Sequence, residues 1–145
     1  IKFHNLLALD KFVNWAKGEI VIEKRIKNEA KYSKMGQIDL TAYLQDNLII
    51  EDELKGEKQE NLFYYYLVNK SNSVIFHEGE AACLSLAISK GYGLACDEKA
   101  VREEFKKKCP NQICTNSWGI IVKAEKLGLI EKNDAENYKK GLHYT

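Results

Sequence analysis

The chain has 145 residues and a mass of 16.6 kDa, which fits one domain. Hydrophobic residues make up 45% and charged residues 30%, and the formal net charge is only +1, which excludes a disordered chain and any overall attraction to nucleic acid or membranes. No stretch approaches the roughly 20 apolar residues that span a bilayer, and no signal peptide is visible, so we expect a cytoplasmic protein.

The cysteines also favour a reduced, cytoplasmic protein. Cys83 and Cys96 lie in apolar runs, as buried free thiols do, and no Cys-x-x-Cys pair accompanies the scattered histidines, which argues against a zinc site. Cys109 and Cys114 flank a turn at Pro110, so oxidation could join them.

Helices and strands alternate in the first half of the chain. Apolar residues at helical spacing predict helices over 6–16, about 23–34 and 39–46, and Gly18 ends the first of them. Short apolar runs predict strands over 19–22 and 48–50. Residues 55–60 fit a loop or the start of a helix. The aromatic run 61–69 does not indicate whether it forms a helix or a strand, and residues 71–73 carry a turn signal.

The second half has clearer signals. A strongly apolar stretch over 78–90 predicts a buried helix that Gly91 closes, and apolar spacing predicts another helix over 117–127 with a Schellman stop at Gly128. Uncharged runs predict strands over 93–96 and 112–114. Asp97 is placed to cap a helix over 98–108, and a capping-box pattern over 133–136 predicts the start of the last helix.

Short uncharged strands that alternate with helices predict an α/β fold with a parallel sheet covered by helices on both faces. Ligands of such sheets bind beyond the carboxyl ends of the strands. The polar residues expected near that edge are Glu29, Glu80, Asp97, Thr115, Asn116 and Ser117.

Carboxylates gathered at strand ends suit Mg²⁺ or Mn²⁺, which prefer oxygen ligands. The sequence has neither the glycine-rich dinucleotide fingerprint nor a P-loop, and it has no nucleophile elbow. Divalent cations polarise phosphoryl oxygens and activate water, so the pattern favours phosphodiester hydrolysis.

Three segments of the second half resemble a known family. They read GEAA at 79–82, GLACDE at 93–98 and TNSWGIIVKAEKLGLI at 115–130, which looks like the second half of a PIN domain of the toxin-like, VapC-related ribonucleases. More loosely, the run 20–22 followed by Asn28-Glu29 is similar to the family's strand-then-glutamate segment. The resemblance covers nearly the whole chain as a single domain, 1–145.

This resemblance implies a three-layer fold and metal-dependent cleavage of RNA. It places three members of the family's acidic quartet on Glu29, Glu80 and Asp97, as catalytic residues and ligands of Mg²⁺ or Mn²⁺, with Thr115 and Asn116 near the substrate. The fourth member is an aspartate that ends the family's first strand. No such strand precedes Leu6, and we expect it to have been lost with an upstream segment, since the chain begins without methionine.

Simpler readings compete with each assignment. Asp97 could be only a helix cap. Glu80 could be a first-turn acid that the helix dipole stabilises, and Glu29 could belong to a solvated helix face. Two functions therefore stand side by side: a metal-dependent endoribonuclease that acts on RNA, with an antitoxin protein or a second copy as partner, and an inactive PIN-like module for RNA binding or protein association.

Overall fold

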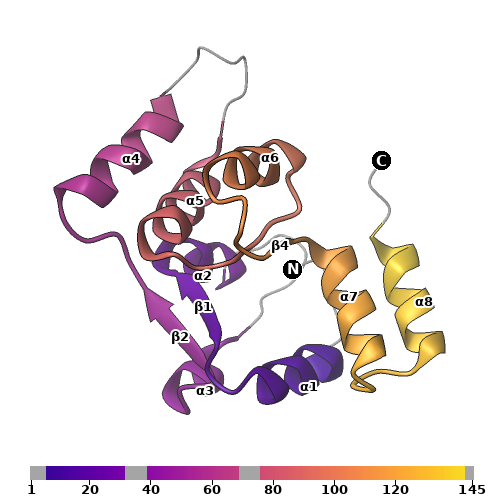
Figure 1. The fold of residues 1–145 in the computed structure, drawn as a ribbon. Coiled ribbons are helices and arrows are strands. Elements are labelled where there is room, and N and C mark those ends of the chain that lie inside the picture. Colours follow the sequence, from indigo (N-terminus) through magenta and orange to yellow (C-terminus); the bar gives the residue numbers. More distant parts are fainter. Residues whose placement is uncertain (1–5, 32–38, 69–75, 143–145) are drawn as a thin grey trace.

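The computed structural model describes residues 6–31, 39–68 and 76–142, and of residues 6–8 and 29–31 it describes the backbone alone (Figure 1). These parts of the chain contain eight helices and four strands. Their bounds are α1 Leu6–Ala16, β1 Ile20–Glu23, α2 Lys24–Lys31, α3 Thr41–Gln45, β2 Ile49–Asp52, α4 Glu57–Val68, α5 Glu78–Lys90, β3 Leu94–Ala95, α6 Lys99–Lys108, β4 Cys114–Thr115, α7 Ser117–Lys126 and α8 Lys132–Gly141. The predicted α/β class is confirmed, and the turn predicted at 71–73 lies outside the described residues.

The first strands, β1 and β2, pair in parallel, with Ile20 opposite Ile49 and Glu23 opposite Asp52. Parallel neighbours need a crossover connection, and the chain between them includes α2 and α3. Apolar side chains of the two strands pack with α1 and α3 around a small core. Its buried members are Val13, Leu40 and Ile49.

The turn between α1 and β1 requires glycine. Gly18 has a φ of +85°, and a Cβ added there would lie 2.8 Å from the carbonyl oxygen of Asn47. The Gly18 amide also donates a hydrogen bond of 3.1 Å to the carbonyl of Leu48. The end of α1 is therefore held against the segment that enters β2.

The main core surrounds α5, whose residues from Gly79 to Ala87 are almost all buried. Alanines on this helix let α4 and α6 approach closely, and Phe63 and Phe105 fill the space between them. Although α5 is strongly apolar, it has only 13 residues. No helix in the described part of the chain is long and apolar enough to cross a membrane.

The four strands form two separate parallel pairs, β1 with β2 and β3 with β4. The sequence predicts one continuous sheet, whereas no backbone ladder joins the two pairs within the described residues. Because β3 and β4 have two residues each, their ladder supplies few hydrogen bonds. Helix α5 packs against both β1 and β3 and so connects the pairs.

Helices α7 and α8 form a hairpin beside this unit (Figure 1). Its buried contacts come from Ile121, Ala135 and Leu142. The predicted Schellman stop of α7 is confirmed, since the Leu129 amide donates to the carbonyl of Ala124 at 2.9 Å.

The predicted capping box at 133–136 is wrong. Helix α8 already begins at Lys132, with Glu131 as its N-cap and no side-chain capping bond. Asn133 therefore lies inside the first turn and cannot cap it.

The aromatic run, whose secondary structure the sequence does not indicate, is helical: its residues 61–68 belong to α4. Tyr66 is buried and its hydroxyl donates to Glu104 at 3.1 Å, whereas Tyr64 and Tyr65 are exposed. The cysteines are free, including Cys109 and Cys114, and the predicted burial of Cys83 and Cys96 is only partial.

Candidate functional site

The Asp97 carboxylate lies at the carboxyl end of β3 and contacts the start of α7. Its Oδ1 accepts a hydrogen bond from the backbone amide of Ser117 at 2.8 Å, and its Oδ2 accepts one from the Ser117 hydroxyl at 2.6 Å. Parallel pairing of Leu94 with Cys114 and of Ala95 with Thr115 brings the segments after both strands together. A carboxylate at this position accepts from a backbone amide that has no hydrogen-bond partner within α7. Its negative charge is also stabilised by the positive amino end of the helix dipole.

This arrangement overturns the prediction that Asp97 caps the next helix. The N-cap of α6 is Glu98, and its side chain makes no capping hydrogen bond. Instead, Arg102 holds the turn before α6, with Nη1 donating to the carbonyl oxygens of Cys96 and Asp97 at 2.9 and 2.8 Å. The Asp97 side chain instead hydrogen-bonds Ser117 of α7.

Thr115 and Asn116 shape the start of α7. Asn116 is its N-cap, and its Oδ1 accepts a hydrogen bond of 2.9 Å from the Gly119 amide. Thr115 lies so close to the first turn that a Cβ on Gly119 would come within 2.2 Å of its Oγ1. Both residues therefore adjoin the Asp97–Ser117 contact, and their role toward a substrate stays a prediction.

Glu80 is fixed in the first turn of α5. Its Oε1 accepts a hydrogen bond of 2.9 Å from the backbone amide of His77, the N-cap residue, as in a capping box. His77 is thus a helix-start residue, as its sequence position suggests. Glu80 is partly buried, and this bond holds its carboxylate at the amino end of α5.

Glu80 and Asp97 both act on the thiol of Cys96. Burial raises the pKa of this thiol, and the negative charges of the Glu80 and Asp97 carboxylates raise it further. Coulombic effects of this kind require proximity, because they weaken with distance and with solvent. The two carboxylates predicted to share a site therefore both influence this thiol, although among the described residues they do not form with it a group close enough to hold a metal ion.

The third predicted ligand, Glu29, belongs to α2, but its side chain lies outside the described residues. Within the described part of the chain, no three or more His, Cys, Asp or Glu side chains gather closely enough to hold a metal ion. The metal site of Glu29, Glu80 and Asp97 thus stays a prediction.

An ion pair between the buried Glu23 and Arg25, at the end of β1, is not among the features predicted from the sequence. The Glu23 side chain is fully buried and accepts from the Arg25 guanidinium at 2.9 Å and from the Arg25 amide at 2.6 Å. Arg25 also pairs with Glu78 of α5 at 3.0 Å and covers the ring of Phe63. The signal that could have revealed Glu23 is its place directly after the apolar run 20–22, at a strand end.

The end of β2 makes a second link to α5. Asp52 accepts from Lys90 at 2.6 Å and from the hydroxyl of Tyr92 at 3.1 Å. Arg25 reaches the first turn of α5 through Glu78, and Asp52 reaches the last turn through Lys90. These carboxylates pair with the charged side chains of Arg25 and Lys90 and hold the elements together.

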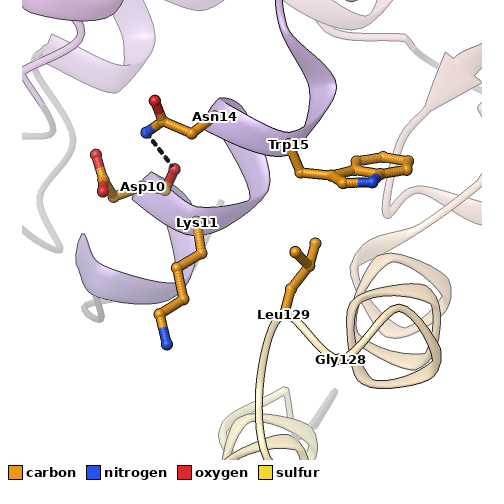
Figure 2. Close-up of a pocket in the computed structure, with 6 residues that line it drawn as sticks. All are labelled: Asp10, Lys11, Asn14, Trp15, Gly128 and Leu129. Atoms are coloured by element: carbon orange, nitrogen blue, oxygen red, sulfur yellow. Dashed lines mark hydrogen bonds between the residues drawn. The ribbon is translucent and has the colours of Figure 1, made fainter.

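A shallow depression lies between α1 and the turn after α7, away from these residues (Figure 2). Leu129 points across it toward Trp15, and Asn14 donates to the carbonyl oxygen of Asp10 at 2.8 Å. The remaining lining residues are Lys11 and Gly128. None of the predicted site residues lines this depression, so the candidate site stays at the β3–β4 edge.

Comparison of the chain with protein-family models, with curated proteins and with solved structures finds no match in any of the three.

Proposed function

We propose that this chain is a metal-dependent endoribonuclease whose cation site includes Glu80 and Asp97, with Glu29 as the third expected ligand. The observation that carries the proposal is the placement of Asp97. It follows a parallel strand, at the edge where ligands of such sheets bind, and its carboxylate is oriented by Ser117. Glu80 supports the proposal, because its charge, like that of Asp97, raises the pKa of the Cys96 thiol.

The donor chemistry fits a hard divalent cation. A carboxylate offers about four lone-pair positions, so the hydrogen bonds from Ser117 and His77 do not exhaust the capacity of Asp97 or Glu80. Mg²⁺ is commonly bound by one or two carboxylates together with water and substrate phosphates. When bound, Mg²⁺ or Mn²⁺ supplies the polarisation of a phosphodiester and the activation of water.

The residues of the chain prepare this site in two ways. Ser117 fixes both oxygens of Asp97, and the His77 amide fixes one oxygen of Glu80, so the carboxylates keep their orientation without a ligand. Thr115 and Asn116 lie next to Ser117 at the start of α7, where the helix dipole favours a phosphate. This position supports their predicted contact with the RNA backbone.

The proposal is tested by cleavage of a labelled single-stranded RNA in the presence of Mn²⁺ or Mg²⁺. Asp97→Asn should lower the rate at least a hundredfold. Glu80→Gln should do the same while α5 stays capped, because glutamine serves a capping box as well as glutamate. Glu98→Gln is the matched control, since Glu98 is exposed and adjacent to Asp97 but makes no capping bond.

Each other result has a definite meaning. If Asp97→Asn and Glu80→Gln cleave as fast as the unchanged chain, the site is wrong. If the chain binds RNA but cleaves none with either cation, it is the inactive PIN-like module. If it neither binds nor cleaves RNA, the ribonuclease proposal is wrong, and only a PIN-like module for protein association remains. An antitoxin partner and a homodimer are further predictions of this proposal.

A further inference from the structure

An exposed tryptophan adjoins the candidate site. Trp118 is the second residue of α7 and directly follows Ser117, the partner of Asp97. The buried face of α7 is formed by Ser117, Ile121 and Ala124, so Trp118 lies outside that face and remains 47% exposed. Nearly half of the Trp118 side chain is therefore accessible to a ligand, one residue away from Ser117.

A lysine accompanies this ring. The Lys139 ammonium of α8 lies 5.2 Å from the centre of the Trp118 ring. The two helices form a hairpin, so the last turn of α8, which carries Lys139 and Lys140, lies beside the first turn of α7. Lys139 also lies 3.6 Å from the Glu136 carboxylate, so one lysine, which has an acidic neighbour, lies over the ring near the positive amino end of α7.

We propose that Trp118 stacks on a base of single-stranded RNA next to the phosphodiester held at Asp97, and that Lys139 binds the adjoining RNA backbone. Sites for single-stranded nucleic acid combine an aromatic platform with positive charge, because every base has a ring face and every linkage a negative charge. This inference deepens the proposed function and rests on it for the position of the cleaved bond. Nearly half of Trp118 stays exposed beside Lys139, which leaves ring surface for a base.

The chain contains its own control. Its other tryptophan, Trp15, is 44% exposed on α1 and lines the same depression as Leu129, just after α7 (Figure 2). Trp118 lies in the first turn of the same ten-residue helix, so α7, about 15 Å long, separates the two positions along its axis. A base that stacks on Trp118 therefore quenches one tryptophan and not the other.

The experiment measures RNA binding in the full chain with Asp97→Asn and a chelator, so that no cleavage intervenes. Trp15→Phe leaves Trp118 as the fluorophore, and Trp118→Phe leaves Trp15. A single-stranded oligouridine should quench the first variant and leave the second nearly unchanged. The same strand in a duplex should quench neither, because its bases are stacked within the helix.

Affinities give a second readout. Trp118→Ala should weaken binding of the oligouridine about tenfold, Trp118→Phe less, since phenylalanine still stacks, and Trp15→Ala not at all. Lys139→Gln should weaken binding and reduce its dependence on salt. Circular dichroism verifies that each variant is folded.

Equal quenching of both tryptophans, or unchanged affinity in folded Trp118→Ala, would overturn the inference. Loss of cleavage in Asp97→Asn together with unchanged affinity in Trp118→Ala refutes the stacking and leaves the proposed function standing. Quenching of Trp118 without cleavage by the unchanged chain supports the stacking and refutes the enzyme.

Discussion

Asp97 binds the first residue of a helix that begins 20 positions later in the chain: both of its carboxylate oxygens accept hydrogen bonds from Ser117. One bond comes from the backbone amide and the other from the hydroxyl of Ser117, which is buried. The contact therefore joins the turn after β3 to the start of α7. It also sets the direction of the carboxylate that we propose as a metal ligand.

A substitution series at this contact should separate fold from chemistry. Asp97→Ala should lower the free energy of unfolding by about 2–3 kcal/mol, since a partly buried amide and hydroxyl lose a charged partner. Asp97→Asn should cost less than about 1 kcal/mol, because its oxygen can accept from the Ser117 amide while its NH₂ donates to the hydroxyl. Urea unfolding measures both values.

Ser117→Ala completes the series. It removes only the hydroxyl bond and should cost about 1 kcal/mol. The double variant Asp97→Ala/Ser117→Ala should cost less than the sum of the single changes, because the two residues share the contact. Strict additivity would mean that the contact adds nothing to stability.

Substitution of Gly119 by alanine should destabilise the fold, although alanine has the higher helix propensity. Alanine inside a helix is favoured over glycine by up to about 1 kcal/mol. A Cβ at this position, however, would lie 2.2 Å from Thr115 Oγ1, so Gly119→Ala should instead cost about 1–3 kcal/mol. Thermal unfolding shows the sign of the change.

The control is Gly141→Ala, in α8, where an added Cβ meets nothing within 4 Å and the change should be neutral or stabilising. Removal of the obstructing oxygen by Thr115→Ala should restore most of the stability of Gly119→Ala. A Gly119→Ala variant as stable as the unchanged chain would show that Thr115 moves aside without cost.

Asp52 should make part of the stability depend on pH. Burial raises the pKa of Asp52, but hydrogen bonds from Lys90, the Glu53 amide and Tyr92 outweigh it and hold the pKa below the ordinary value of 3.8. A carboxyl whose pKa is lower in the folded state stabilises that state above its unfolded pKa, and the effect is lost as the pH falls through the folded pKa. The unchanged chain should therefore lose this contribution below about pH 4.

Asp52→Asn gives the comparison. Its melting temperature should be lower than that of the unchanged chain at pH 7, and the difference should shrink as the pH falls from 5 to 3. Asp134→Asn is the matched control at an exposed carboxyl in α8. A difference that stays constant between pH 7 and 3 would mean that the charge of Asp52 contributes nothing.

Local patterns determined most of the helices. The apolar stretch of α5 and the glycine that ends it are contiguous in sequence, and the structure begins and ends this helix where the pattern predicts. The Schellman stop of α7 likewise needs only Gly128 and its neighbours. Such features follow from backbone geometry and side-chain burial within a few residues, which a sequence displays directly.

Tertiary structure decided which partner each polar side chain takes. Asp97 had a local candidate in α6 and a distant one in Ser117, and the pairing of β3 with β4 brought the distant one within 2.6 Å. The buried bond of Glu23 to Arg25 gained its link to Glu78 only because α5 packs beside β1. A sequence shows which groups can donate or accept, but choices among competing partners depend on packing between distant segments, and that packing exists only in the folded chain.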